Sequence, residues 1–297
     1  MIRPVNFGFN EETAESNAFQ NRDAVQQNVQ EKALKEFDGF VKLLRNNGVN
    51  VTVINDTPQP YTPDSIFPNN WVSFHEDGTV FLYPMQAANR RLERREDIIR
   101  DLQEDFTITH ITDLSRFEDE NKFLEGTGSM VLDRENKIAF ACLSPRTDEE
   151  VLHVFCEQAG YKPVLFHAVD QNNTPIYHTN VLMAIAEKYA VICLDSITNI
   201  YEKETVINSF KSTNKDIILI SFEQMNHFAG NMLELQNQSG ESLIVMSKSA
   251  WESLDDGQKS DLSKHSKPVY ADINTIETIG GGSARCMMAE VWLPVSI

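Results

Sequence analysis

The stretch IGGGSARCMM, residues 279 to 288, places Cys286 behind three glycines, and four earlier segments of the chain have the same organisation. Each has a polar or small-residue head before or within an apolar run: SIFPNNWVSF (65–74), FLEGTGSMVL (123–132), IYHTNVLMAI (176–185) and HFAGNMLELQ (227–236). Separations of 55, 53, 53 and 55 residues link successive heads, which are Asn70, Glu125, His178, Asn231 and Cys286. Such a repeat is typical of a fold built from copies of one supersecondary unit.

The first four copies continue with a second apolar run: TVFLYPM (79–85), KIAFACL (137–143), YAVICL (189–194) and SLIVM (242–246). Their β-propensity and the turn signals between the runs predict β-hairpins. Helix-forming segments then follow at 92–105, 148–160, 203–213 and 253–265. For the second of these, Thr147 and Glu150 resemble a capping box, and Gly160 is the predicted stop.

The fifth copy has no helix after it, and the first fifty residues supply what is missing. Residues 3–9 are predicted to form a strand and residues 21–48 a long amphipathic helix. We therefore expect a single domain, 1–297, of the α/β class: a five-bladed pseudo-symmetric propeller closed by its N- and C-terminal segments, with the five heads meeting on the axis. The polar segments 117–122 and 171–175 are interpreted as surface connections, with a lid over the axis as the alternative.

The net charge is −18 and the isoelectric point is near 4.8. This disfavours nucleic acid or an anionic membrane as a partner, because binding to polyanions depends on Lys and Arg. The first residues, MIRPVNFGFN, lack a basic segment followed by an apolar run, and nowhere do eighteen apolar residues run together. The expected location is the cytoplasm.

Four cysteines without a CxxC pair fit neither a disulfide framework nor a zinc site. Cys142, Cys156 and Cys193 lie in apolar segments, where free cysteine behaves as a small hydrophobe. Metal-binding, Walker and Rossmann motifs are also missing from the sequence. We therefore expect neither a metal nor another cofactor.

Cys286 differs from the other cysteines because the preceding glycines allow close approach of the backbone to a ligand. Taken alone, it would be interpreted as a buried strand cysteine; the repeat places it beside His178 and Glu125, which favours a nucleophile. His178 can move protons near neutral pH. Glu125 could orient the histidine, bind a substrate nitrogen, or be a strand-end carboxylate facing water.

Four of these segments resemble a known superfamily. LEGTGS, YHTNVLM, FAGNMLEL and GGGSARC, in this order, resemble the Glu, His, Asn and Cys segments of the guanidino-group-modifying (pentein) superfamily, and SPRTD (144–148) is similar to its SxRT segment. This superfamily includes arginine deiminases and amidinotransferases. RPVNFGFNEETAESNAFQ and PDSIFPNNW are most similar to the bacterial branch of citrulline-utilisation hydrolases.

The resemblance implies a five-bladed propeller with an axial active site. Cys286 would attack the central carbon of a guanidino or ureido group, and His178 would protonate the leaving nitrogen and then activate water. Glu125 would support His178 and hold a substrate nitrogen. The covalent cysteinyl intermediate divides one difficult displacement into two easier steps.

The expected substrate follows from two departures from the arginine pattern. Arginine-processing members commonly have carboxylates where this chain has Asn70 and Asn180, because a guanidinium is a cation with donors only. An amide both donates and accepts, which suits the neutral ureido group of citrulline. The expected products are ornithine, carbon dioxide and ammonia. Asp64 lies close enough in sequence to supply a carboxylate to a guanidinium instead.

Further contacts to the substrate are expected from Asn231 and from a cation that binds the α-carboxylate. The sequence offers four arginines for that role without ranking them: Arg3, Arg90, Arg91 and Arg146. Deimination of arginine or methylarginine, or transfer of an amidino group, remains the alternative function. A non-catalytic propeller, as in a related translation initiation factor, would not need the Cys–His–Glu set. A homodimer is an expectation at the level of the family.

Overall fold

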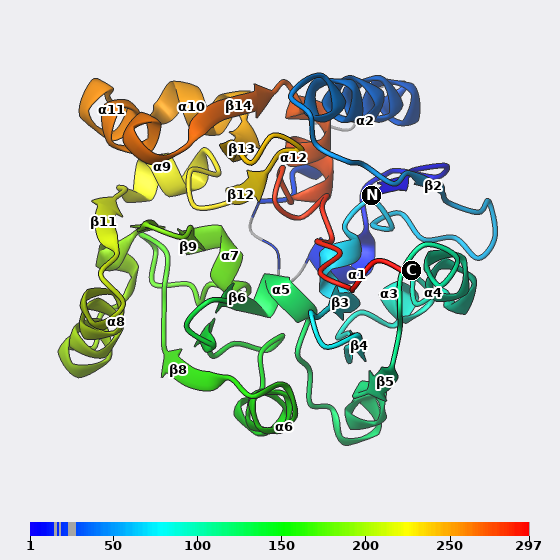
Figure 1. Cartoon of the computed structure of the whole chain (residues 1–297), viewed down its shortest axis with the longest axis horizontal. Coiled ribbons are helices and arrows are strands. Elements are labelled where there is room, and N and C mark those ends of the chain that lie inside the picture. The colour runs from blue at the N-terminus through cyan, green and yellow to red at the C-terminus, as the bar shows by residue number, and fades with distance from the viewer. Residues whose placement is uncertain (15–16, 18, 23–27, 297) are drawn as a thin grey trace.

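Four repeated units surround a common centre in the computed structural model, which describes residues 1–14, 17, 19–22 and 28–296 (Figure 1). Each unit is a three-stranded sheet: an antiparallel hairpin whose second strand pairs in parallel with a third strand. The hairpins predicted from the repeat are confirmed, whereas the third strands were not predicted. The strands are β3 (Val72–Phe74), β4 (Thr79–Leu82), β5 (His110–Asp113), β6 (Met130–Asp133), β7 (Ile138–Cys142), β8 (Lys162–Phe166), β9 (Met183–Ile185), β10 (Tyr189–Ile192), β11 (Asp216–Leu219), β12 (Leu233–Gln236), β13 (Ser242–Ser247) and β14 (Lys267–Ala271).

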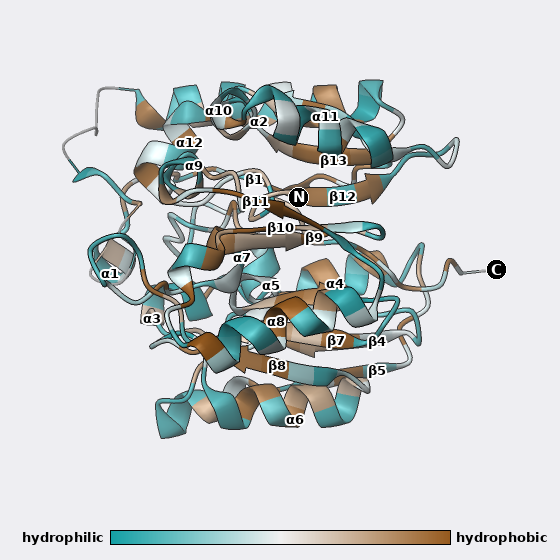
Figure 2. Ribbon diagram, turned by 90° about the vertical axis from the view of Figure 1, so that its left-hand side faces the viewer, coloured by the Kyte–Doolittle hydropathy of each residue, from teal (hydrophilic) through white to brown (hydrophobic). Residues whose placement is uncertain are grey.

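A helical segment precedes the third strand of each unit, because a parallel pair requires a crossover connection. These helices lie at the periphery of Figure 1, and their outward faces are largely hydrophilic in Figure 2. The predicted segments 92–105, 148–160 and 253–265 each enclose one of these helices, whereas the helix Ile200–Ser212 begins three residues before the predicted segment 203–213. The crossover helices are α3 (Ala88–Arg91), α4 (Glu96–Leu102), α6 (Glu149–Ala159), α8 (Ile200–Ser212), α10 (Lys248–Ser253) and α11 (Asp256–His265).

The two ends of α6 show how local chemistry sets a boundary. Gly160 ends the helix with φ of 71°, the left-handed conformation that glycine adopts readily, as predicted. The predicted capping box at Thr147 is wrong. The side chain of Asp148 caps the helix instead, because its carboxylate accepts hydrogen bonds from the backbone N–H groups of Glu150 and Val151.

The expected closure by the chain ends is not found among the described residues. The predicted strand 3–9 is reduced to β1 (Ile2–Arg3), which pairs with β2 (Ile54–Asn55) in a separate two-stranded sheet. The apolar segment after the fifth head is not a strand as it is in the other four copies: backbone hydrogen bonds from Cys286 to Ser283 and from Met287 to Ala284 coil it into turns. Further along, Val295 forms an isolated bridge to Phe106.

The N-terminal helix packs beside the fifth head. It is observed as α2 (Val29–Asn46), and part of the predicted helix, residues 23–27, lies outside the described residues. Its partner is α12 (Asn274–Gly280), which leads directly into the glycines before Cys286. One hydrophobic cluster contains Phe37, Ile276 and Cys286, so α2 and the fifth head share a core.

Short helical turns begin several of the repeated units at the centre of the molecule. They are η2 (Pro68–Asn70), α5 (Gly126–Ser129) and α7 (Thr179–Leu182), and each leads into the inner strand of its unit. Other helical elements of the described residues are α1 (Glu11–Ala14), η3 (Ser115–Glu120), η4 (Leu194–Ser196) and α9 (Phe222–Asn226). Much of the segment 117–122, interpreted as a surface connection, is therefore helical, and Glu118 anchors it to Arg94. Across the described residues, no helix is both long and apolar enough to cross a membrane.

Candidate active site

The five heads of the repeat lie in the buried centre of the molecule. Asn70 ends η2, while Glu125 and His178 immediately precede α5 and α7. Asn231 and Cys286 lie in turns, and Cys286 is only 7% exposed. Residues separated by more than two hundred positions are thus brought together by the repetition of one unit.

Two glycines next to Glu125 permit this close packing. Gly126 has φ of 46° and lies against the backbone carbonyl of Asn69, where a side chain would be strained and would clash. A Cβ at Gly128 would come within 2.8 Å of His178 Nδ1 and even closer to Asn70 Nδ2. The GTG sequence therefore lets the first three heads approach one another.

Glu125 connects the histidine to a buried arginine. Its Oε2 lies 2.8 Å from His178 Nε2 and 3.5 Å from Arg146 Nη1. The guanidinium of Arg146 also lies 4.8 Å from the centre of the Tyr177 ring and donates to the Thr13 carbonyl. All three ionisable side chains are buried, so their interactions are not screened by solvent.

The electrostatics of this group define the proton-accepting atom of the histidine. Burial raises the pKa of Glu125, but Arg146 and His178 outweigh it and hold the pKa below its ordinary value. Burial lowers the pKa of His178 to about 4, although Glu125 opposes the change. The ionised Glu125 accepts the Nε2–H of a neutral imidazole, which leaves the lone pair on Nδ1.

Two amides surround the sulfur of Cys286. The Nδ2 atoms of Asn180 and Asn231 lie 3.5 and 3.3 Å from Sγ. Asn231 is itself fixed, because its Oδ1 accepts the backbone N–H of Arg285 and its Nδ2 also donates to the Asn180 carbonyl. The sulfur also lies 3.6 Å from Asn231 Oδ1, so both polar atoms of that amide approach it.

Asn70 is held by a buried ion pair that the sequence analysis did not identify. Arg90 Nη1 donates to Asn70 Oδ1 over 2.8 Å, and Glu93 accepts from Arg90 Nε and Nη2, both over 2.9 Å. Asp64 Oδ2 lies 3.9 Å from Arg90 Nε. The local signal for this pair was the spacing of three residues between Arg90, in α3, and Glu93, in the turn that follows the helix.

The N-terminal segment adds contacts that sequence analysis also missed. Asn10 and Thr13 donate hydrogen bonds to Asp64 Oδ2 over 2.7 and 3.2 Å. Burial raises the pKa of Asp64, while Arg90 and Asn10 act in the opposite direction. No sequence pattern connects residues 10 and 64, so only the fold could reveal this contact.

Several buried polar atoms have no hydrogen-bond partner in the part of the chain that the structure describes. Three of them belong to predicted site residues: Asp64 Oδ1, Asn70 Nδ2 and Asn180 Oδ1. Both polar atoms of the Asn69 side chain are also buried without a hydrogen-bond partner among the described residues. Because unpaired buried polar groups are costly, each such atom in a native protein requires an explanation.

The four candidate arginines are separated by the fold. Arg3 is paired with Asp38 in a partly exposed ion pair, and Arg91 lies 3.4 Å from Glu118. Only Arg90 and Arg146 belong to the buried cluster.

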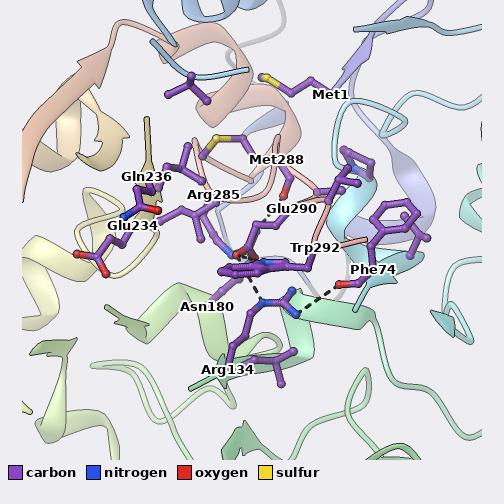
Figure 3. A pocket seen from close by; sticks show the side chains of 18 of the residues that line it. Met1, Phe74, Arg134, Asn180, Glu234, Gln236, Arg285, Met288, Glu290 and Trp292 are labelled. Carbon is purple, nitrogen blue, oxygen red and sulfur yellow. Dashed lines mark hydrogen bonds and ion pairs between the residues drawn. The ribbon is translucent and has the colours of Figure 1, made fainter. Parts of the chain in front are cut away.

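A cavity of about 980 Å³ reaches Asn180 and Arg285 but is not lined by Cys286, His178 or Glu125 (Figure 3). Its lining includes residues from the inner strands of all four three-stranded sheets. Arg285 projects there and lies 3.0 Å from Glu290, and Arg134 lies 3.6 Å from the same carboxylate. Arg285 is therefore occupied in an ion pair, although it neighbours the cysteine in sequence. Within the described residues, no group of His, Cys, Asp and Glu side chains has a metal-binding arrangement.

Small α/β units around a buried cysteine, histidine and glutamate define the class of this protein: it is a pentein, one of the guanidino-group-modifying enzymes. The chain belongs to the family described as "N,N dimethylarginine dimethylhydrolase, eukaryotic", whose model matches residues 3–293. It is therefore a hydrolase of the guanidino-modifying kind. No curated protein matches the chain in sequence.

Solved structures share the fold at low sequence identity. ArgZ, an arginine dihydrolase from the ornithine–ammonia cycle in cyanobacteria, superimposes with a TM-score of 0.77 at 14% identity; the match covers 100% of this chain and 42% of ArgZ. The N-terminal domain of ArgZ, as a Cys-to-Ser variant bound to substrate, gives a TM-score of 0.77 at 16% identity, with coverage of 99% and 97%. A dimethylarginine dimethylaminohydrolase adduct with 4-chloro-2-hydroxymethylpyridine gives a TM-score of 0.64 at 15% identity, with 96% of both chains covered.

Proposed function

We propose that this hydrolase converts citrulline to ornithine, carbon dioxide and ammonia through a covalent intermediate on Cys286. The observation that carries the proposal is the pair of unpartnered amide atoms, Asn70 Nδ2 and Asn180 Oδ1. One is a donor and the other an acceptor, and a ureido group offers a carbonyl acceptor beside N–H donors. The protein would thus present one complementary atom to each side of the substrate group.

A guanidinium fits the same pair less well. It has only donors, so an N–H group would face the Nδ2 donor of Asn70. The alternative function, on arginine or methylarginine, is favoured by one observation: Asp64 Oδ1 is a buried acceptor without a protein partner among the described residues. ArgZ, described as an arginine dihydrolase, and the family's dimethylarginine name support the same alternative.

The proposed reaction begins with removal of the Cys286 proton. His178 Nδ1 takes the proton as sulfur attacks the ureido carbon, while Asn180 and Asn231 stabilise charge on the sulfur. The protonated histidine then gives the proton to the leaving nitrogen, ammonia or the alkyl amine. Glu125 stabilises the imidazolium through its hydrogen bond to Nε2.

Water completes the reaction in the second half. His178 Nδ1 activates the water molecule, which attacks the cysteinyl adduct and restores the thiol. Carbamate chemistry then releases carbon dioxide, so that citrulline and water together give ornithine, carbon dioxide and ammonia. Every proton transfer in this scheme uses side chains of this chain, and no cofactor is required.

The remaining parts of the substrate are assigned to the surrounding residues. Arg146, buried beside Glu125 and the N-terminal segment, is the proposed ligand of the α-carboxylate. We further propose that residues 1–297 form one domain, a pseudo-fivefold propeller with this cluster on its axis. The cytoplasmic location and the homodimer stay predictions.

Product analysis tests the proposed function directly. Purified protein is offered L-citrulline and, separately, L-arginine, and release of ornithine, citrulline and ammonia is measured. Ornithine and ammonia from citrulline, with little turnover of arginine, are the expected result. Conversion of arginine as the preferred substrate would contradict the proposal and establish the alternative.

The pH dependence of kcat/KM is expected to report His178. The neutral imidazole is the base, so activity should fall as pH drops through about 4, where His178 becomes protonated. Glu125→Gln removes an interaction that raises this pKa, so the acid limb should shift to lower pH and kcat should fall about 10²-fold. Initial rates would be measured from pH 3 to 8, with circular dichroism checking the fold at each pH. An acid limb that stays in place would show that Glu125 does not act on the histidine.

A further inference from the structure

We propose that the buried carboxyl group of Glu277 positions the turn that carries Cys286, and that it does so through the hydroxyl group of Ser283. This inference rests on the proposed role of Cys286 as the nucleophile and adds a positioning residue to that role. Glu277 acts on the reaction without touching the substrate, because its effect reaches Cys286 through two hydrogen bonds in series.

The two hydrogen bonds meet at Ser283. Ser283 Oγ donates to Glu277 Oε1 over 2.6 Å, and both side chains are buried. The backbone N–H of Cys286 donates to the Ser283 carbonyl over 3.0 Å and closes a turn of four residues. The side chain of Ser283 is thus bound to Glu277 while its backbone is bound to Cys286. The position of Ser283 therefore sets where the turn presents the sulfur.

Glu277 belongs to a helix, α12, that is held at both ends. At its start, the carboxylate of Glu36 in α2 accepts the backbone N–H groups of Thr275 and Ile276, over 2.9 and 3.0 Å. At its end, Gly281 adopts φ of 66° and its N–H donates to the Glu277 carbonyl. The helix lies beside α2 (Figure 1). A side chain on a fixed helix is positioned more precisely than one on a loop, so Glu277 is suited to anchor the loop that follows it.

The surroundings of Glu277 disfavour an ionised carboxylate. Burial raises its pKa to about 7; hydrogen bonds with Ser283 and Ser247 act in the opposite direction, and the charges of Glu36 and Asp272 raise the pKa further. A buried carboxyl group among acidic neighbours costs stability, which an apolar side chain would avoid. What a carboxyl group offers there, in either protonation state, is an oxygen that accepts the hydroxyl of Ser283.

The anchor is expected to act on the chemical step and not on substrate binding. The proposed ligands of the substrate, which include Asn70, Arg146 and Asn180, belong to other repeated units. A shift of the turn would therefore move the sulfur and leave those contacts in place. Displacement of a reacting group by about 1 Å can cost about 10²-fold in rate.

Substitutions at both ends of the hydrogen bond test this role, with turnover measured on whichever of citrulline and arginine the parent converts. Glu277→Leu should lower kcat about 10²-fold and leave KM within about threefold. Glu277→Gln keeps an acceptor of the same shape and should retain kcat within about threefold of the parent. Ser283→Ala should lower kcat about tenfold. The double variant Glu277→Leu with Ser283→Ala should be no slower than Glu277→Leu, because both changes remove the same hydrogen bond.

A matched control loses a hydrogen bond of the same kind elsewhere in the same unit. Ser266 is buried immediately before β14, and its hydroxyl donates to Glu234 Oε1 over 2.7 Å. Ser266→Ala should leave kcat unchanged.

Hydrogen exchange gives a readout that needs no substrate. Exchange of the backbone amides would be followed by mass spectrometry on a peptide that covers residues 281–288. Glu277→Leu and Ser283→Ala should speed exchange of the Cys286 turn about tenfold, because they loosen a local structure that the hydrogen bond holds closed. Glu277→Gln and Ser266→Ala should exchange as the parent does.

The outcomes distinguish the inference from the function on which it rests. The inference is overturned if Glu277→Leu keeps the parent's kcat, if its loss lies in KM alone, or if Glu277→Gln loses as much kcat as Glu277→Leu. Ser283→Ala carries the test if Glu277→Leu does not fold. If the parent converts neither citrulline nor arginine, the proposed function fails, and hydrogen exchange decides the inference: unchanged exchange of the Cys286 turn in Glu277→Leu or Ser283→Ala overturns it, and faster exchange supports it.

Discussion

Replacing Cys286 with alanine is expected to lower kcat for citrulline at least about 10⁴-fold, the scale at which a covalent nucleophile is lost. The reason is that no neighbouring group can replace the sulfur: Asn180 and Asn231 offer amide donors to it, and neither is a nucleophile. Ornithine release would be followed over hours, since the residual rate will be slow.

A matched control uses another buried cysteine of this chain. Cys156 lies in α6, and burial raises the pKa of its thiol to about 12, so it is not expected to react at neutral pH. Cys156→Ala should retain turnover within about twofold of the parent. Thermal unfolding of both variants would show that the loss at position 286 is chemical. Turnover by Cys286→Ala at a rate near that of the parent would exclude the covalent mechanism.

Replacing Asn70 with aspartate is expected to reverse the substrate preference. The carboxylate cannot donate to the ureido oxygen and places a negative charge beside it, so kcat/KM for citrulline should fall about 10³- to 10⁴-fold, as for sites that lose a required hydrogen bond to the substrate. Arginine should gain, because its guanidinium can donate to the oxygen that does not face Arg90. Both values of kcat/KM would be measured side by side.

Asn70→Ala separates the two parts of this effect. It removes the donor without adding charge, so citrulline turnover should fall while arginine gains nothing. In the aspartate variant, Arg90 should hold the new carboxylate where it now holds the amide, because it can donate to either oxygen. An unchanged ratio of citrulline to arginine in that variant would mean that Asn70 does not contact the group being hydrolysed.

The hairpins and the positions of the heads could be predicted from local sequence patterns. The third strands, at the edges of the sheets, could not. The strands β6 and β7 consist almost entirely of apolar or β-branched residues. Such runs have a high β-propensity and can be predicted as strands from the sequence. The third strands are less distinctive: β5 has the sequence HITD and is largely exposed, and β8 contains a proline. An edge strand is paired on one side only, so its sequence is weakly constrained.

The secondary structure of the segment around Cys286 could not be predicted for a different reason. CMMAEV is apolar enough to resemble a strand, yet backbone hydrogen bonds coil its beginning, and Met287 and Met288 are buried in the core shared with α2. Burial of this segment depends on a helix more than two hundred residues away. Local hydrophobicity cannot distinguish a strand from a buried turn in that situation.

Local pattern was sufficient to establish the repeat, and with it the five heads that meet at the centre, because copies of one unit put equivalent positions in equivalent places. Sequence analysis named Arg90 only as one of four candidate ligands of the substrate carboxylate and did not identify its pairing with Glu93. The contact of this pair with Asn70, and the direction in which the amide oxygen points, came from the tertiary structure alone. Hydrogen bonds between distant segments depend on which atoms the folded backbone brings within about 3 Å, and no single stretch of sequence contains that information.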